Sequence, residues 1–189
     1  QSPSHENELW TEFWMNYYDN SKRMNKHEIV YTHGSIQISD TRPFRQAFVD
    51  VTLDDVMHHL PGNKDLFDVT ENWAHDAAKS IIELHKQGFT VYITTDHGNV
   101  YSYGWRNLLP EEKTYLYKNE SRGKRHMMYQ DNQAMFNFVD SNIEISKELL
   151  VHDKWIVWRT AKCFDSQDII THGGAHFLEV VIPFITIDK

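Results

Sequence analysis

Apolar side chains recur every three or four positions in several segments of the chain, which is the spacing of an amphipathic helix. The longest stripe runs over Asp68–Gln87 and ends at Gly88, a residue that often closes helices because it tolerates a left-handed backbone. A second stripe, formed by aromatic residues, predicts a helix over Leu9–Tyr18. Shorter helical segments are predicted over residues 110–118, 132–142 and, as a single turn, 174–179.

Short runs of β-branched and aromatic residues between these helices predict strands. The clearest is Phe89–Thr94, because it follows the long helix directly and so completes half of a strand–helix–strand unit. Further strands are expected over residues 27–32, 47–53, 125–130, 155–160 and 180–187. The alternation of strands and helices predicts an α/β fold with a mixed, mostly parallel sheet flanked by helices.

The composition is that of a folded domain. In 189 residues, 40% are apolar and 24% charged, which supports a hydrophobic core and excludes a disordered tail or a coiled coil. Nineteen Lys and Arg against 27 Asp and Glu give a net charge of −8, which disfavours a general nucleic-acid or anionic-membrane binder. The longest apolar run, Val180–Ile187, is too short to span a membrane. The lone Cys163 and the lack of a recognisable export signal predict a cytoplasmic protein.

The tripeptide Asp96-His97-Gly98 directly follows the predicted strand Phe89–Thr94. Open α/β sheets bind ligands outside the carboxyl ends of their strands, so this position suits a functional site. Adjacent carboxylate and imidazole groups can reach one metal ion if the backbone turns sharply, which Gly98 permits. An ordinary Asx turn with a solvent-exposed His97 is the alternative interpretation.

A second cluster of acidic residues and histidines spans residues 54–59. On a helix, Asp54 would lie beside His58 and Asp55 beside His59, because positions i and i+4 share a face. Mixed oxygen and nitrogen ligands suit Zn²⁺ or Mn²⁺ better than Ca²⁺. The alternative is a first helical turn whose acidic residues interact favourably with the helix dipole.

Thr171-His172-Gly173-Gly174 is the third candidate segment, because two glycines let the backbone fold closely around the group that the imidazole faces. A plain tight turn before a buried terminal strand is the alternative. Together, the three segments supply the carboxylates and imidazoles that catalytic sites use to hold two metal ions about 3.5–4 Å apart. The combination predicts a two-metal site more specifically than any one segment.

These segments also carry a family resemblance. TTDHGN, residues 94–99, resembles the metal-binding signature of the alkaline phosphatase superfamily. The ordered set LDDVMH, KQGFTVYITTDHGNV and THGGAHFLEVVIPF is closer still to the PglZ domain of that superfamily. The resemblance covers about Phe48–Ile187 and is weaker between about Trp105 and Asp165.

The resemblance implies two divalent metal ions, with Zn²⁺ expected first and Mn²⁺ next. The implied ligands are Asp54, His58 and His172 for one ion and Asp96 and His97 for the other. The pair Asp54 and His58 is preferred because Asp54 follows the strand-like Leu53, but the frame of Asp55 and His59 stays open.

The superfamily also requires a Ser or Thr nucleophile and a further acid from a preceding region, and neither is found in this sequence. Residues 1–189 are therefore expected to be the carboxyl-terminal portion of a larger PglZ-like domain, with no assignable catalytic residue and little activity alone. The resemblance implies hydrolysis of phosphate monoesters or diesters in a bacterial phage-defence or signalling protein that contains other domains. The alternative is a non-catalytic PglZ-like module that binds another protein.

A run of basic residues at 122–126 contrasts with the net negative charge of the chain. Guanidinium groups bind phosphate oxygens through two hydrogen bonds, so Arg122 and Arg125 are candidate phosphate-binding residues. Such a role would allow a nucleotide or nucleic acid as the phosphate-ester substrate. A solvated basic loop is the alternative.

Overall fold

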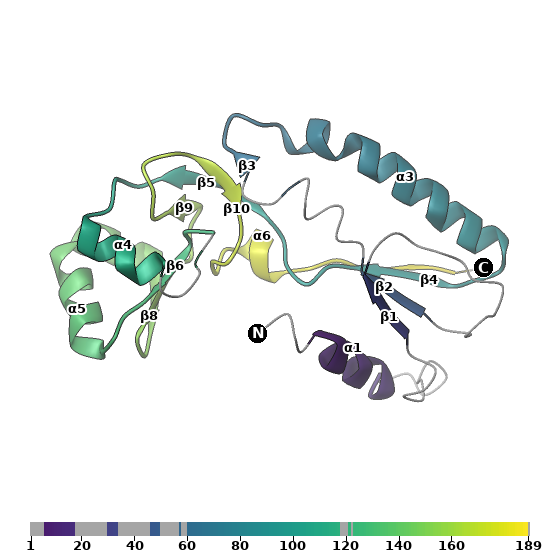
Figure 1. Cartoon of the computed structure of the whole chain (residues 1–189), viewed down its shortest axis with the longest axis horizontal. Coiled ribbons are helices and arrows are strands. Elements are labelled where there is room, and N and C mark those ends of the chain that lie inside the picture. Colours follow the sequence, from purple (N-terminus) through teal and green to yellow (C-terminus); the bar gives the residue numbers. More distant parts are fainter. Residues whose placement is uncertain are drawn as a thin grey trace. The chain divides into compact units, whose positions relative to one another are not determined.

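The computed structural model describes residues 6–17, 30–33, 46–49, 57, 60–117, 121 and 123–188. The chain divides into two compact units, Gln1–Val56 and Met57–Lys189. Helices accompany strands that pair in both parallel and antiparallel fashion, which confirms the predicted α/β class with mixed sheets (Figure 1).

The described elements of the first unit are helix α1 (Glu6–Met15) and the parallel strands β1 (Val30–His33) and β2 (Gln46–Val49). Helix α1 carries the predicted aromatic stripe. Trp14 and Tyr17 are buried, and the rings of Trp10 and Phe13 stack with their centroids 5.7 Å apart. The aromatic side chains therefore pack against one another along one face of the helix.

Helix α3 (Leu66–Lys86) follows the short strand Leu60–Pro61 in the second unit and is the long amphipathic helix that the sequence predicts. The Asp65 side chain accepts hydrogen bonds from the first helical turn, as an N-cap residue does. At the other end, the N–H groups of Gly88 and Phe89 donate to carbonyls of the last turn, and Gly88 has a φ of 85°. This Schellman motif confirms the predicted role of Gly88. In the described part of the chain, no helix combines the length and the apolar character that a membrane span needs.

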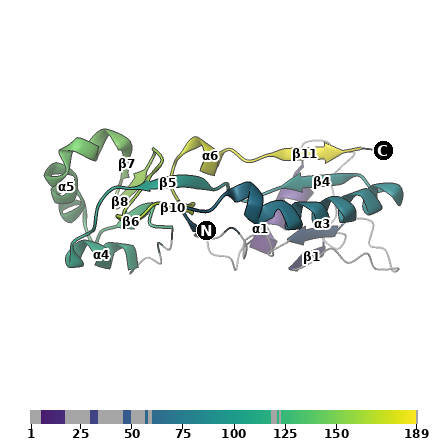
Figure 2. The same cartoon turned by 90° about the horizontal axis from the view of Figure 1, so that it is seen from above.

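Strand β4 (Val91–Thr94) follows α3 and pairs antiparallel with the final strand β11 (Phe184–Ile187), as Figure 2 shows. Helix α3 packs beside β4. The strand predicted over 180–187 is wrong in its first half, because Val180 ends the short helix α6 (Phe177–Val180). Pro183, which has no N–H to donate to a strand ladder, lies directly before β11.

Two further sheets complete the described part of the second unit. The four-stranded sheet has the order β3 (Leu60–Pro61), β10 (Ile169–Thr171), β5 (Val100–Gly104) and β9 (Lys162–Cys163). The three-stranded sheet has the order β6 (His126–Met128), β8 (Trp155–Trp158) and β7 (Leu149–His152). Among the described strands, only the β1–β2 and β5–β9 pairs are parallel, which is a smaller parallel share than the sequence predicted. Short connections such as Asp153-Lys154 between β7 and β8 explain this, because a parallel pair needs a long crossover.

The main hydrophobic core is formed by the three-stranded sheet and the helices next to it in sequence. These helices are α4 (Pro110–Tyr117), α5 (Asn132–Ser141) and the 3₁₀ helix η4 (Ile143–Glu148). Met127, Ile156 and Trp158 have 0% of their surface exposed, so β6 and β8 form the centre of this core. The predicted starts of α4 at Pro110 and α5 at Asn132 are confirmed.

Helix α4 begins beside a bidentate ion pair between Arg106 and Glu112. Both N–H···O contacts are 2.8 Å long, and the Arg106 guanidinium lies 4.0 Å from the centre of the Trp105 ring. Burial raises the pKa of Glu112, but hydrogen bonds from Arg106 and the Leu109 N–H outweigh this and leave the pKa below its ordinary value. The ionised form of Glu112 therefore stabilises the fold, and this contribution is lost as the pH falls through that lowered pKa.

We predict that Gly88→Ala lowers the free energy of unfolding by about 1 kcal/mol, because a Cβ atom is unfavourable in the left-handed region. Thermal or denaturant unfolding measures this change. Gln87→Ala is the matched control, since Gln87 has a φ of −78° in the same helix end, and it should cost less than about 0.5 kcal/mol. Equal losses in the two variants would contradict the role assigned to Gly88.

Candidate functional site

Two loops leave neighbouring strands at the same end of the four-stranded sheet. We call residues 95–99, between β4 and β5, the DHG loop, and residues 172–176, between β10 and α6, the HGG loop. The strand register pairs Thr171, the last residue of β10, with Val100, the first residue of β5. Because these strands are antiparallel, the loop that precedes Val100 and the loop that follows Thr171 must emerge side by side.

The β4–β11 pair brings the segment after the HGG loop to the same place. Its register places Thr94 opposite Phe184, and the Thr94 hydroxyl donates to the Pro183 carbonyl at 2.7 Å. The Gly98 N–H donates to the Glu179 carbonyl at 3.1 Å. A Cβ atom on Gly98 would lie only 1.9 Å from the carbonyl oxygen of Leu178, the residue before Glu179. Glycine is therefore needed at position 98 for a close backbone contact, in addition to the sharp turn that the sequence suggested.

His97 and His172 face each other across the two loops. Their rings stack with centroids 4.0 Å apart and planes 16° from parallel. The carboxylate of Asp96 lies 3.6 Å from Nε2 of His97, and the side chains of Asp96 and His97 are 69% and 33% exposed. His97 is thus partly enclosed, in contrast to the fully solvated side chain of the plain-turn alternative.

The structure brings the predicted ligands His97 and His172 together, and Asp96 contacts its neighbour His97. The other predicted ligands, Asp54 and His58, lie outside the described residues, and so does the alternative frame of Asp55 and His59. Among the residues that are described, no three His, Cys, Asp or Glu side chains form a group that could hold one metal ion. The predicted ligand set therefore stays a prediction.

The stacked geometry of the two imidazoles limits what they can bind. The lone pair of an imidazole nitrogen lies in the plane of its ring, so two nearly parallel rings do not direct their nitrogens at one point. They can, however, each bind one of two neighbouring ions, and two-metal sites have ions about 3.5–4 Å apart. The residues present thus fit an assignment in which His97 and His172 bind different ions.

The basic run at 122–126 was interpreted from the sequence either as phosphate-binding or as a solvated loop, and the structure places Arg125 in neither role. Arg122 lies outside the described residues, whereas Arg125 is 0% exposed, so a solvated loop is wrong for Arg125. Its Nε and Nη2 atoms donate to the two carboxylate oxygens of Glu179 at 3.0 and 2.6 Å. Its Nη1 atom donates to the carbonyl oxygens of Thr160 and Lys162. Phosphate binding by Arg125 would require these internal bonds to break.

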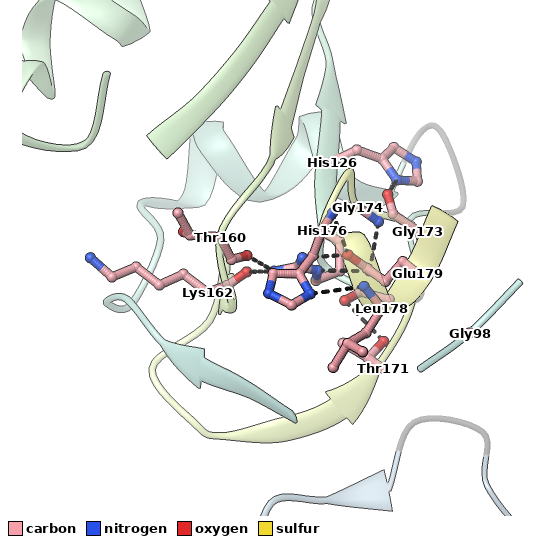
Figure 3. Close-up of polar contacts among 12 residues, drawn as sticks. Gly98, His126, Thr160, Lys162, Thr171, Gly173, Gly174, His176, Leu178 and Glu179 are labelled. Atoms are coloured by element: carbon pink, nitrogen blue, oxygen red, sulfur yellow. Dashed lines mark hydrogen bonds and ion pairs between the residues drawn. The ribbon is translucent and has the colours of Figure 1, made fainter. Parts of the chain in front are cut away.

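Glu179 is a site residue that the sequence analysis did not identify. Its side chain accepts hydrogen bonds from the N–H groups of Gly174 at 2.9 Å and His176 at 3.0 Å, as well as from Arg125 (Figure 3). His176 and Glu179 form a capping box at the start of α6. The available signal was a single acidic residue in the apolar run FLEVVIPF. In the structure Glu179 is buried although its neighbours Phe177 and Val180 are exposed, and a buried carboxylate needs hydrogen-bond partners.

The segment that leads into β6 encloses the other side of the HGG loop. A Cβ atom on Gly123 would lie 2.1 Å from the carbonyl oxygen of His172, and Nδ1 of His126 lies 3.1 Å from the carbonyl oxygen of Gly173. Burial lowers the pKa of His126, and the bond to Gly173 offsets this only in part. His126 is therefore predominantly neutral at pH 7, and the backbone of the HGG loop is fixed from two sides.

Comparison with known families places the chain in one of them. The model of the PglZ family, described as the BREX system PglZ alkaline phosphatase-like domain, matches residues 2–187. The chain therefore belongs to the PglZ family, whose context is phage defence, and the match extends well before Phe48, where the resemblance in the sequence began. No curated protein and no solved structure gives a significant match.

We predict that the ring protons of His97 are shifted upfield by the ring of His172 in the metal-free protein. His172→Ala should move them downfield, towards the positions of an isolated histidine, in ¹H–¹³C spectra recorded above pH 8, where imidazoles are neutral. His152→Ala, at an exposed position on β7, is the control and should leave these resonances in place. Unchanged His97 resonances in His172→Ala would show that the two rings do not stack.

Proposed function

We propose that the protein acts, as part of a larger PglZ protein, as a metal-dependent phosphoesterase that hydrolyses a phosphate monoester or diester. The observation that carries this proposal is the stacking of His97 on His172, with the Asp96 carboxylate 3.6 Å from Nε2 of His97, in two loops next to paired strands. Membership of an alkaline phosphatase-like family supports it, because that superfamily generally uses divalent metal ions.

In this proposal, Asp54, His58 and His172 hold one ion, while Asp96 and His97 hold the second. The mixed nitrogen and oxygen ligands favour Zn²⁺, with Mn²⁺ next. Three protein ligands with an open fourth position are the usual set of a catalytic zinc ion. The second ion has only two ligands here, so it needs a further acid from another part of the PglZ domain.

The chemistry divides between the ions and the chain. Two divalent ions, when bound, supply positive charge that favours an ionised nucleophile and offsets the negative charge of phosphate oxygens. The chain orients the ligands and keeps His97 and His172 at a fixed spacing before substrate arrives. The net charge of −8 does not oppose a phosphate substrate, since bound cations would dominate the local field. The proposed substrate is a small phosphate ester, a nucleotide or a nucleic acid, and the proposed location is the cytoplasm.

We predict that the purified chain retains about one Zn²⁺ ion after equilibration and dialysis, because one of the two proposed sites has three ligands. Elemental analysis of His172→Ala should show loss of this ion, and Asp96→Ala should show reduced uptake under excess Zn²⁺. His152→Ala is the control and should retain the wild-type metal content. Equal metal content in all variants would contradict the ligand assignment. A folded wild-type chain that takes up no metal would favour the non-catalytic interaction module instead.

We also predict that the full-length protein releases product from a nitrophenyl phosphate monoester or diester only when Zn²⁺ or Mn²⁺ is present. Chelation should abolish turnover and added metal should restore it. The ligand side chains without metal ions lack the positive charge that stabilises the phosphate oxygens in the transition state. His97→Ala should lower the rate by at least about 100-fold, because even groups that only orient a metal ligand contribute about 10–100-fold. Turnover that survives chelation would contradict a metal-dependent mechanism.

A further inference from the structure

We propose that the buried Arg125–Glu179 ion pair is a positioning device that sets the spacing between His97 and His172. It does so by tying the DHG and HGG loops to each other and to the hydrophobic core around β6 and β8. The consequence for metal binding rests on the proposed function, whereas the consequence for the spacing of the two rings does not.

Burying the charges of Arg125 and Glu179 costs free energy. The Arg125 and Glu179 side chains are only 0% and 2% exposed, and buried charges lose hydration that only excellent geometry can replace. Glu179 achieves this geometry, because each carboxylate oxygen accepts one bond from Arg125 and one from a backbone N–H. Apolar residues of similar volume often stabilise a core equally well, so stability alone does not account for such a pair.

The side chain of Glu179 holds the backbone of the HGG loop. Two of its partners are the N–H groups of Gly174 and His176, which belong to the HGG loop. Gly174 lies so close to the pair that a Cβ atom there would be 2.5 Å from Nη2 of Arg125 and 2.7 Å from Oε2 of Glu179. The glycine therefore lets the loop backbone close onto the ion pair, which fixes the path of the chain directly after His172.

Glu179 also binds the DHG loop, through its backbone. Its carbonyl oxygen accepts the N–H of Gly98, the residue after His97, at 3.1 Å. The carbonyl of Leu178 lies against the Cα of the same glycine, with no room for a side chain between them. One residue thus contacts the chain beside each histidine, so a shift of Glu179 displaces both loops.

Arg125 connects the ion pair to the strands of the hydrophobic core. Arg125 directly precedes β6, and its carbonyl oxygen accepts the N–H of Trp158 at 2.9 Å. Its Nη1 atom binds the carbonyls of Thr160 and Lys162, which follow β8. The N–H of Ala175 in the HGG loop donates to the carbonyl of Trp158 at 2.8 Å. The pair is therefore anchored in the most buried part of the molecule, which makes it a rigid reference for the site.

The test is Glu179→Gln, which preserves the size of the side chain but removes the charge that holds Arg125. We expect a folded protein by circular dichroism in which the upfield shift of the His97 ring protons is lost in the metal-free state. Titration with Zn²⁺ alone should show an affinity lower by about 10–100-fold, the usual effect of removing a group that orients metal ligands.

Glu112→Gln is the matched control. It breaks a bidentate Arg–Glu pair in the same unit, with both contacts at 2.8 Å, and Glu112 has no recorded bond to either loop among the described residues. It should lower the melting temperature but leave both the His97 resonances and the Zn²⁺ affinity unchanged. If the two variants alter these readouts equally, general destabilisation is the cause and the proposal is overturned.

Glu179→Asp provides a second route if Glu179→Gln does not fold. It keeps the charge beside Arg125 but withdraws the carboxylate by one methylene group, so the histidine rings should separate while the charge pair persists. Wild-type His97 resonances in a folded Glu179 variant would overturn the proposal. If the wild type binds no Zn²⁺ but its ring stacking depends on Glu179, the positioning role holds and the phosphoesterase proposal fails.

Discussion

The arrangement of the candidate site depends on the need of one buried carboxylate, that of Glu179, for hydrogen-bond donors. A carboxylate that is 2% exposed cannot keep its hydration, so it must collect donors from the protein around it. The donors available are Arg125 and two backbone N–H groups of the HGG loop, while its carbonyl holds Gly98. Satisfying this single residue brings together segments that are about eighty residues apart in the sequence, and with them His97 and His172.

The strand register is the second condition for the site. The pairing of Thr171 with Val100 places one loop after a strand and the other before its neighbour, so antiparallel geometry alone makes them adjacent. The DHG loop follows the carboxyl end of β4, the position at which open parallel sheets bind ligands, although β4 itself pairs antiparallel with β11. The two loops lie side by side, however, because β10 pairs antiparallel with β5. An antiparallel pair places the loop before one strand beside the loop after its neighbour, whereas a parallel pair places two loops that both follow their strands side by side.

Local signals in the sequence predicted local structure well. The Gly88 cap and the strand before Asp96 were accessible because a turn residue and a hydrophobic period act over a few positions. The role of Arg125 was not, because its partner Glu179 is 54 residues away and no short-range pattern links them. Exposed Arg and buried Arg look alike in a sequence, and only the tertiary structure supplies the carboxylate. The same limitation applies to β5 and β10, whose pairing places the site but leaves no mark on either strand alone.

A crystal structure of the chain grown with Zn²⁺, with the metal located by its anomalous scattering, would show whether the Arg125–Glu179 pair builds a metal site from the two loops. We expect an ion bound by His172, the ring of His97 still facing the ring of His172, and Glu179 still paired with Arg125. Zinc bound elsewhere, or His97 and His172 far apart while Glu179 points into solvent, would contradict the central claim that this buried pair builds a metal site from two loops.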